Sequence, residues 1–400
     1  MVKILVFNAG SSSLKFSLFE AEDERLLADG GIDWKSEPTR LVMRRHGAAA
    51  TSQRLQLNSH ADAVARVIGE ISATNGGIDV VAHRVVHGGA RYAHAVHITP
   101  AVRDAIDELA ELAPLHNRPS LQVIDAARAT LPNVPQVAAF DTSFHSTLPA
   151  DARTYAIPRT WTREWGLIRY GFHGLSHQYC AGRAAEMLGR TDARLIIAHL
   201  GNGASLSAVR VGTCIDTSMG FTPMEGLMMG TRSGSVDPGL LIHLMRKHGL
   251  DADGLDRALN HESGLLGVSG ISSDMRQVLE AMPHSENARL AIDIYVHRLR
   301  QTIGAMAATL GGVDALVFTA GVGENAPEIR RRACENLGFL GIALDAQANV
   351  SCKPDGDIAT PASAARVLVI ATREDLTIVR EARRIVGTVP AAESCNASPN

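Results

Sequence analysis

The sequence predicts an α/β protein that contains two domains of related fold. Strand-like runs alternate with helical patterns along the 400 residues, which is typical of α/β architecture. Residues 4–18 (ILVFNAGSSSLKFSL) and 195–209 (LIIAHLGNGASLSAV) share one layout: an apolar strand, a turn of small residues with glycine, and a second strand. When these segments are aligned, Asn8 meets His199 and Gly10 meets Gly201. Because such hairpins are common, coincidence stays open as the alternative to duplication.

The predicted elements follow from the spacing of apolar residues. Runs typical of strands lie at 2–8, 14–19, 40–45, 78–86, 135–140, 194–199, 205–210, 313–319 and 366–371. Helical spacing lies at about 60–73, 100–112, 118–130, 175–188, 238–248, 272–282, 286–310, 326–337 and 373–386. Thr99-Pro100 is a typical helix start, with a capping hydroxyl followed by proline in the first turn. The periodicity ends after Val386, so we expect residues 389–400 to be a disordered tail.

Composition favours an ordinary globular enzyme or binding protein. The chain is 46% hydrophobic and 20% charged, with a net charge of −3, so neither a nucleic acid nor an anionic membrane is expected as a partner. The five cysteines are odd in number and form no C-x-x-C pair. Together with an N-terminal apolar run that stops at Asn8, too short for a signal peptide, this pattern predicts a cytoplasmic protein with reduced thiols.

Two glycine turns have the composition of anion-binding loops. Gly10 with Ser11–Ser13 places backbone amides and three hydroxyls at one bend, and Gly201-Asn202-Gly203 forms a second. Lys15 adds a positive charge close to the first bend. Either turn alone is more simply explained as a connection between strands, since Asn, Gly and Ser dominate turns. The two together, with the lysine, favour phosphate binding.

A third glycine loop follows the apolar run that ends at Thr319. Its residues match G-x-G-x-x-A at Gly321, Gly323 and Ala326, and Asp345 follows 19 residues after the alanine. This spacing supports a rival hypothesis, an NAD-dependent oxidoreductase with a dinucleotide-binding fold. The short remainder of the chain and the two hairpins speak against it. No G-x-x-x-x-G-K-[ST] motif occurs anywhere in the sequence.

Several charged or histidine residues lie in unusual places. Arg84 interrupts an apolar strand, where a charge is costly unless it is paired or used. Asp141 follows an apolar strand, at the end where α/β proteins commonly bind ligands. His173 lies between Phe172 and Gly174. No carboxylate lies near it in the sequence, so we do not expect a zinc site there. Each residue also has a purely structural explanation. Arg84 would then form an ion pair, Asp141 would cap a helix or turn, and His173 would be a structural histidine.

Residues 216–239 form a long stretch rich in glycine and methionine. Its apolar side chains do not suit a flexible linker, so we expect a packed segment that presents its central arginine, Arg232, in a turn. Arginine is the residue best suited to bidentate binding of phosphate or carboxylate.

Taken together these stretches resemble the acetate kinase family. The motifs NAGSSSLKF, HRVVHGG, LAPLHN, FDTSFH, RYGFHGLSH, HLGNGASL, DTSMGFTPMEGLMMGTRSG, ISSDMR and FTAGVGEN occur in this order over about residues 2–386. The resemblance implies two duplicated actin-like (ribonuclease H-like) domains with an ATP cleft between them, as in sugar kinases, heat-shock chaperones and actin. The domains would span residues 1–145 with 376–388, and 146–375, and the family is homodimeric through the second domain.

The implied reaction is reversible, direct in-line transfer of the ATP γ-phosphoryl group to acetate, giving acetyl phosphate and ADP with Mg²⁺ (or Mn²⁺). By motif position, the catalytic residues would be Asp141, His173 and Arg232, and the substrate-binding residues would be Arg84, Val86, Leu115, Phe172 and Pro223. ATP would be bound by Lys15, Ser11, Ser12, Ser13, His199, Leu200, Gly201, Asn202, Gly203, Asp274, Met275, Arg276, Gly321, Val322, Gly323, Glu324 and Asn325. Asn8 and Glu374 would bind the metal.

Three features refine this expectation. Acetate is already ionised at neutral pH, so we hypothesise that Asp141, which the family assigns as acid/base, mainly orients Arg84 or a water and the metal. Where the family usually has T-N-E-E, this chain has Thr372-Arg373-Glu374-Asp375, and Arg118-Pro119 stands after LAPLHN. Val86 favours acetate over propionate, although a propionate kinase of the same family and an ATP-binding switch remain as alternatives.

Overall fold

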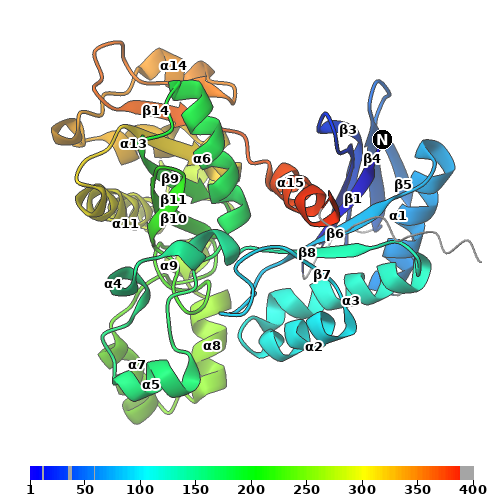
Figure 1. Cartoon of the computed structure of the whole chain (residues 1–400). Helices are drawn as coiled ribbons and strands as arrows, with labels where there is room; N and C mark the ends of the chain where they lie inside the picture. The colour runs from blue at the N-terminus through cyan, green and yellow to red at the C-terminus, as the bar shows by residue number, and fades with distance from the viewer. Residues whose placement is uncertain (11–12, 35–37, 58, 388–400) are drawn as a thin grey trace, which may run out of the picture. The chain divides into compact units, whose positions relative to one another are not determined.

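The computed structural model describes residues 1–10, 13–34, 38–57 and 59–387, and it divides into two compact units. The first unit comprises Met1–Ser143 and the C-terminal segment from Asp375, and the second comprises Phe144–Glu374. Each unit is built on one mixed β-sheet with helices packed against it (Figure 1). The expected tail, residues 389–400, lies outside the described residues.

In the first unit the strands of the described residues follow the order β5-β4-β3-β2-β1-β6-β8-β7. The strands are β1 (Lys3–Ala9), β2 (Ser13–Glu20), β3 (Arg25–Asp33), β4 (Arg40–Arg45), β5 (Thr51–Arg54), β6 (Val80–Val85), β7 (Val96–His97) and β8 (Gln136–Phe140). Strand β1 is antiparallel to β2 and parallel to β6, which is parallel to β8. The helices are α1 (His60–Asn75), α2 (Pro100–Glu108), α3 (Pro114–Thr130) and α15 (Glu374–Gly387), with a 3-10 turn at Leu109–Glu111.

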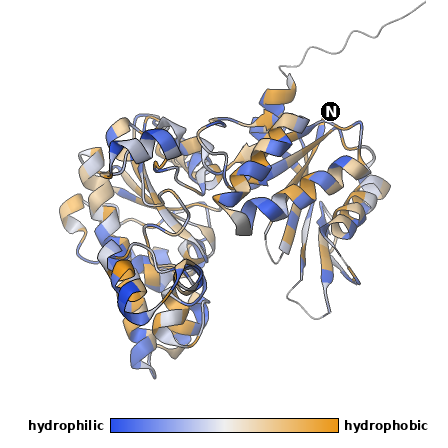
Figure 2. Ribbon diagram, turned by 90° about the horizontal axis from the view of Figure 1, so that it is seen from below, coloured by the Kyte–Doolittle hydropathy of each residue, from blue (hydrophilic) through white to orange (hydrophobic). Residues whose placement is uncertain are grey.

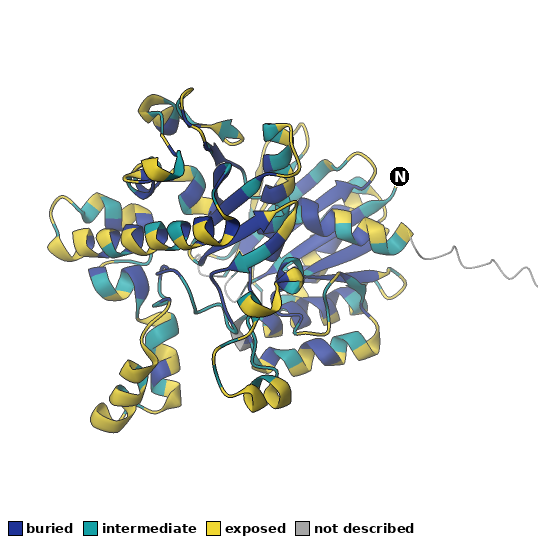
Figure 3. Ribbon diagram, turned by 60° about the vertical axis from the view of Figure 1, so that its left-hand side comes forward, coloured by how far each residue is buried: buried dark blue, intermediate teal, exposed yellow. Residues whose placement is uncertain are grey.

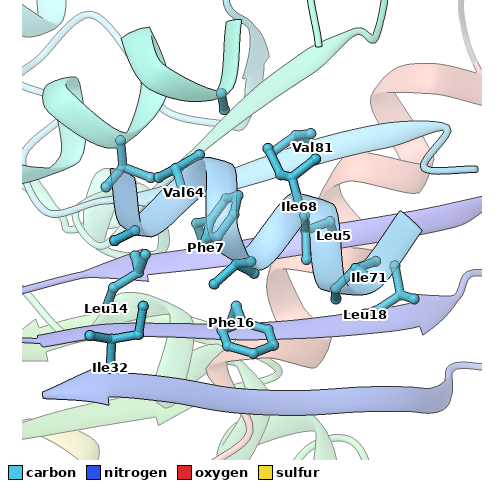
Figure 4. Close-up of a cluster of buried hydrophobic side chains, with 14 of the residues drawn as sticks. Leu5, Phe7, Leu14, Phe16, Leu18, Ile32, Val64, Ile68, Ile71 and Val81 are labelled. Atoms are coloured by element: carbon cyan, nitrogen blue, oxygen red, sulfur yellow. The ribbon is translucent and has the colours of Figure 1, made fainter. Parts of the chain in front are cut away.

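The core of the first unit follows from the alternation of apolar residues in the first hairpin. Leu5 and Phe7 of β1, together with Leu14 and Phe16 of β2, are buried on one side of the sheet. There they contact the apolar face of α1, which includes Val64, Ile68 and Ile71 (Figure 4).

Helix α15 returns from the far end of the sequence, and its Arg380 forms an ion pair with Glu24 at 2.7 Å.

The second unit has the strand order β11-β10-β9-β12-β14-β13 in its described residues. The strands are β9 (Arg194–Leu200), β10 (Ala204–Arg210), β11 (Thr213–Thr217), β12 (Ala315–Thr319), β13 (Gly356–Asp357) and β14 (Arg366–Val369). Helix α6 (Gly174–Leu188) covers one side of this sheet, and α11 (Glu286–Leu310) covers the other (Figure 1). Orange and blue residues alternate along such helices in Figure 2, as expected for helices with one buried face.

The remaining elements of the second unit surround this sheet. They are α4 (Ala150–Arg153), α5 (Arg159–Trp165), α7 (Pro238–His248), α8 (Ala252–His261), α9 (Gly264–Ser269), α10 (Met275–Ala281), α12 (Ala320–Asn325), α13 (Pro327–Cys334), α14 (Ala346–Ser351) and 3-10 turns at Ser143–Thr147 and Gly338–Leu340. No helix among the described residues is both long and apolar enough to cross a membrane.

The two sheets share one topology, which confirms the predicted duplication. The order β3-β2-β1-β6-β8 in the first unit corresponds to β11-β10-β9-β12-β14 in the second, and each pair of neighbours has the same relative direction. The two similar hairpins found in the sequence, β1-β2 and β9-β10, occupy equivalent places. The resemblance between them therefore reflects a repeated fold.

Strand β3 was not predicted, because Asp29, Gly30 and Gly31 are residue types that strands usually avoid. The structure shows why Gly30 is present: a Cβ atom there would lie 2.1 Å from the Val42 carbonyl oxygen and 2.7 Å from the Phe16 ring. Strand β4 can approach this closely only because residue 30 has no side chain. Helix α3 also begins earlier than predicted, at Pro114, and continues through Pro119.

Candidate active site

Asn8, Arg84 and Asp141 meet in the first unit at the carboxyl ends of three neighbouring strands, β1, β6 and β8. Arg84 donates from Nε to Asp141 Oδ1 at 2.9 Å and from Nη2 to Oδ2 at 2.5 Å. Its Nη1 donates to Asn8 Oδ1 at 3.1 Å. The Asp141 side chain is almost fully buried, whereas that of Arg84 retains 18% of its exposure. The carboxylate therefore holds the arginine by a two-bond fork that sets the direction of the guanidinium.

Other residues expected around the substrate lie in both units. Val86 follows β6 directly and is only 5% exposed. Next to it, the side chain of Asn117 accepts from the His87 amide and donates to its carbonyl, which ties this turn to α3. Phe172 is buried in the second unit, and Pro223 is half-buried there. The side chain of Leu115, like residues Ser11 and Ser12, lies outside the described residues.

The first hairpin places Lys15 opposite Asn8 in the pairing of β1 with β2. Lys15 is exposed and Ser13 is half-buried. The amide of Gly10 donates to the Ser13 carbonyl at 2.8 Å, and in the equivalent hairpin the amide of Gly201 donates to the Gly203 carbonyl at 2.9 Å. In both hairpins, therefore, a hydrogen bond from the amide of the turn glycine to a nearby backbone carbonyl closes the turn.

The second unit contains a cavity of about 510 Å³ that unites three of the predicted motifs. Its lining consists of Gly201, Asn202, Leu265, Ser273, Asp274, Met275, Arg276, Gly321, Val322, Asn325 and Ala326. His199, Leu200, Gly203, Gly323 and Glu324 were also expected to bind ATP but do not line this cavity. Leu265 and Ser273 were not singled out, because an apolar residue or a serine next to a motif gives no local signal, and Ala326 was noted only as part of the dinucleotide-binding pattern.

Residues 321–325 were expected to form a glycine loop, and the structure corrects this: they belong to helix α12. Two residues outside the motif, Thr372 and Arg330, hold that helix through four hydrogen bonds. Thr372 Oγ1 accepts from the Ala320 amide at 2.8 Å, and the Thr372 amide donates to Glu324 Oε1 at 2.9 Å. The buried Arg330 donates to the carbonyl oxygens of Gly323 and Glu324 at 2.8 and 2.7 Å.

The dinucleotide-binding alternative is wrong. Its fingerprint requires an acidic residue at the end of the next strand, but Asp345 lies at the start of helix α14. Its side chain accepts from the Ala348 amide at 2.8 Å, so it serves as a helix cap.

Residues 216–239 form a packed segment, as expected. Met219, Leu227, Met228 and Met229 are buried. Arg232 donates to the Pro223 carbonyl, and burial lowers its pKa to about 10, so the guanidinium stays charged at neutral pH. Arg232 reaches the second hairpin: a Cβ atom on Gly203 would lie 2.5 Å from its Nη2.

His173 approaches the same glycine. A Cβ atom on Gly203 would lie 3.3 Å from His173 Nε2, so only glycine leaves room for both side chains at this turn. His173 has a φ of 58°, a left-handed backbone conformation that is rare for residues other than glycine and frequent at functional sites. His199 stacks against it, with ring centroids 4.2 Å apart. The structure thus brings Arg232, His173 and the GNG turn together.

Comparisons with known proteins agree with this picture. The model of the acetokinase family matches residues 3–380. The chain belongs to the acetokinase family. It is 52% identical to an acetate kinase of Gloeobacter violaceus, over 95% of this chain and 98% of that protein. It is 50% identical to an acetate kinase of Nostoc punctiforme, over 96% and 100%.

Solved structures of the family confirm the duplicated actin-like fold. The acetate kinase of Porphyromonas gingivalis has a TM-score of 0.88 at 40% identity, and a propionate kinase of Francisella tularensis has a TM-score of 0.90 at 37%. Each covers 96% of this chain and 100% of the other. The group around Arg84 and Asp141 and the group around His173 and Arg232 therefore lie in a protein with the fold of this family.

The expected metal ligands Asn8 and Glu374 belong to different units. Both offer side-chain oxygen atoms, the donors that Mg²⁺ prefers, and the Asn8 amide oxygen accepts a hydrogen bond from Arg84. Glu374 is the last residue of the second unit and also the first residue of α15, whose remaining residues belong to the first unit. Within the described residues, no group of three or more His, Cys, Asp and Glu side chains could hold a metal ion. A site with few protein ligands is usual for magnesium bound with a nucleotide.

Proposed function

We propose that this protein is an acetate kinase, which transfers the γ-phosphoryl group of ATP reversibly to acetate and produces acetyl phosphate and ADP. The observation that carries the proposal is the approach of Arg232 and His173 to Gly203, next to a cavity lined by Gly201 and Asn202. Two donors at a glycine turn suit a phosphoryl group, whose transfer depends on positioning and charge stabilisation more than on covalent chemistry.

ATP is expected to occupy the 510 Å³ cavity, whose volume lies in the usual range for small-molecule sites. Asp274, Met275 and Arg276 line one part, and Gly321, Val322 and Asn325 line another, so these residues would hold the adenosine. The GNG turn would then receive the phosphates, with Lys15 as an additional cation. A magnesium or manganese ion held through Asn8 and Glu374 would neutralise charge on the β- and γ-phosphates.

Acetate is expected to bind through its carboxylate to Arg84. The fork from Asp141 leaves the guanidinium in one orientation, so the arginine is preorganised before acetate arrives. Because acetate is already an anion, it needs no base. One of its oxygens attacks the γ-phosphorus directly as the bond to ADP breaks, and Arg232 and His173 stabilise the charge on the transferring group.

The decisive experiment is acyl phosphate trapping. The protein is incubated with MgATP and acetate, and the product is captured with hydroxylamine, beside parallel reactions with propionate and with no acid. Acetate-dependent hydroxamate, with less from propionate, supports the proposal. ATP hydrolysis without hydroxamate would instead indicate an ATP-binding switch. A propionate kinase is the second candidate, since one such structure is similar to this chain, and a higher yield with propionate would identify it.

We also propose that the protein forms a homodimer through α7 of the second unit. Figure 3 shows buried residues (dark blue) along the strands and exposed residues (yellow) on the outer sides of the helices. No residue of α7 is buried, and Leu240, Ile242 and Met245 are each between 46% and 49% exposed. A run of exposed apolar side chains on one helix is typical of a protein interface.

A cytoplasmic location is our final proposal. The cysteines within the described residues, Cys180, Cys214, Cys334 and Cys352, are all free thiols. Burial raises the pKa of the first three to about 12, which keeps them protonated and unreactive. Free thiols are the usual state in a reducing compartment.

A further inference from the structure

Behind His173 lies a buried hydroxyl that contacts two imidazoles. Ser205 on β10 has no exposed surface, and its Oγ lies 2.9 Å from His173 Nδ1 and 2.8 Å from His177 Nε2. A serine hydroxyl has a single proton to donate. If it accepts a hydrogen bond from one histidine, its own proton is free to go to the other. The protonation of the two rings is therefore coupled through Ser205.

The surroundings of His177 decide the direction of this coupling. Its ring is fully buried, and burial together with His145 and His199 lowers its pKa well below the usual value, so the ring is neutral. Among the described residues, Nδ1 of His177 has no hydrogen-bond partner. A buried N–H without an acceptor is rarer than a buried acceptor without a donor. The single proton of His177 therefore belongs on Nε2, where Ser205 accepts it.

A neighbouring histidine follows the same logic. His145 Nε2 lies 2.9 Å from the Phe172 carbonyl oxygen, which can only accept, so this nitrogen carries the proton. Burial lowers the pKa of His145 to about 4, so its ring is neutral as well. The bond supports the backbone directly before His173. A neutral, buried shell thus surrounds the inner edge of the His173 ring.

We propose that Ser205 and His177 are positioning residues that set the tautomer of His173. His177 Nε2–H donates to Ser205, Ser205 donates to His173 Nδ1, and the proton of the neutral His173 ring consequently sits on Nε2. That nitrogen is the one beside Gly203 and Arg232. Resting on the proposed function, this inference makes His173 a neutral hydrogen-bond donor to the transferring phosphoryl group, with Arg232 as the cation.

The tautomer can be observed directly by NMR on protein labelled with ¹⁵N-histidine. The His173 signals are assigned by their loss in His173→Gln. We expect a neutral ring with its proton on Nε2 in the unliganded protein at neutral pH. A proton on Nδ1 alone, or a doubly protonated ring, would overturn the proposal. The measurement does not depend on turnover, so it stays decisive even if the protein phosphorylates a different acid.

Kinetics of Ser205→Ala test the consequence. Removing a complete transition-state donor lowers kcat by about 100- to 1,000-fold. Ser205→Ala keeps His173 but lets it adopt the wrong tautomer for part of the time, so we expect a smaller loss of kcat, about tenfold, with the KM for ATP changed less than about twofold. In NMR, His173 should then show a mixture of tautomers.

Two further variants separate this role from loss of a buried hydroxyl. Ser205→Thr retains the hydroxyl and should recover most of kcat and the Nε2–H signature. Ser207→Ala is the matched control, because Ser207 is also fully buried on β10 and its hydroxyl lies 3.2 Å from Thr217 Oγ1. Its kcat should remain within about twofold of the wild type. Equal losses in Ser205→Ala and Ser207→Ala would show that Ser205 acts only through packing.

Discussion

Arg84 lies in an apolar strand, and Asp141 reaches it from the end of the neighbouring strand. The arginine alone would be costly in this position, but the carboxylate fork balances its charge and sets its direction. The sequence indicated both residues separately. Their pairing depends on β6 and β8 being parallel neighbours, with Arg84 opposite Ala139.

The orienting role of Asp141 predicts strong coupling with Arg84. We expect Asp141→Ala and Arg84→Ala each to raise the KM for acetate and to lower kcat, and the double variant to be little worse than the more damaging single one. The coupling should amount to about 1–3 kcal/mol, as for residues in direct contact. Acetyl phosphate formation by all four proteins measures it. Additive losses, or near-normal turnover of Asp141→Asn, would contradict this role.

Val86 predicts the acid preference. We expect Val86 to line the acyl pocket, so Val86→Ala should enlarge that pocket. The kcat/KM for propionate relative to acetate should then rise about tenfold, since one methylene is worth about 1–3 kcal/mol in a pocket. Val85→Ala is the control, because Val85 is buried in a separate apolar cluster beside Ile106 and Phe140. It should lower stability and leave the ratio unchanged. A similar shift in both variants would show that Val86 does not line the acyl pocket.

At the scale of elements, helix α12 depends on a neighbour that the motif does not include. Arg330 of α13 is 1% exposed, and its guanidinium is surrounded by carbonyl oxygens of Gly323, Glu324 and Asn349 and by the Asn349 side chain. This one side chain satisfies the C-terminal end of α12, whose carbonyls would otherwise be buried without donors.

Arg330→Met should therefore destabilise the protein by about 2–4 kcal/mol, because several buried carbonyls lose charged donors. Denaturant unfolding measures this change, and isothermal titration should show weaker MgADP binding. Arg331→Met is the matched control on the same helix. Arg331 pairs with Glu328 and Glu335 at the surface, where ion pairs contribute about 1 kcal/mol or less. Equal effects of the two substitutions would refute the role of Arg330.

At the scale of the whole molecule, each unit contains a buried neutral histidine. His83 lies in the first unit and His145 in the second, and burial lowers the pKa of each to about 4. In the unfolded chain both groups have a pKa near 6.5. Below about pH 6.5 the unfolded state binds protons at these histidines and the folded state does not. The free energy of unfolding must therefore decrease as the pH is lowered.

Above about pH 6.5 we expect these two histidines to add no pH dependence to the free energy of unfolding. As the pH is lowered from 6.5 to about 4, we expect the free energy of unfolding to decrease. Each buried histidine should contribute about 1.4 kcal/mol per pH unit in that window. Denaturant unfolding at pH 7.5, 6.0 and 5.0 measures the slope. His83→Leu should be less stable at pH 7.5 but should show a shallower slope. An unchanged slope would mean that His83 becomes protonated without unfolding.

The proposed dimer predicts that one charge on α7 separates the subunits. Light scattering should give twice the chain mass of 42.6 kDa for the wild type and a single chain mass for Ile242→Glu. Burying a carboxylate in an apolar interface is strongly unfavourable. Val350→Glu serves as the control, since Val350 is a 70% exposed apolar residue on α14. Dimers of Ile242→Glu would exclude α7 from the interface.

The sequence by itself determined the fold class, indicated the duplication and singled out the polar residues that we propose as site residues. Hairpins, glycine turns and helix starts are encoded by neighbouring residues, so local patterns suffice to find them. The arginines, histidines and carboxylates were visible because each is unusual in its local setting.

Only the tertiary structure decided how those residues work together. Gly30 lies in a strand because β2 and β4 pair with β3 on either side, and residues 321–325 form a helix whose ends are satisfied by Thr372 and Arg330. Ser205 had no distinguishing mark, and its importance comes from two histidines about 30 residues away in sequence. Hydrogen-bond partners and close approaches are set by packing between distant segments, and no local pattern contains them.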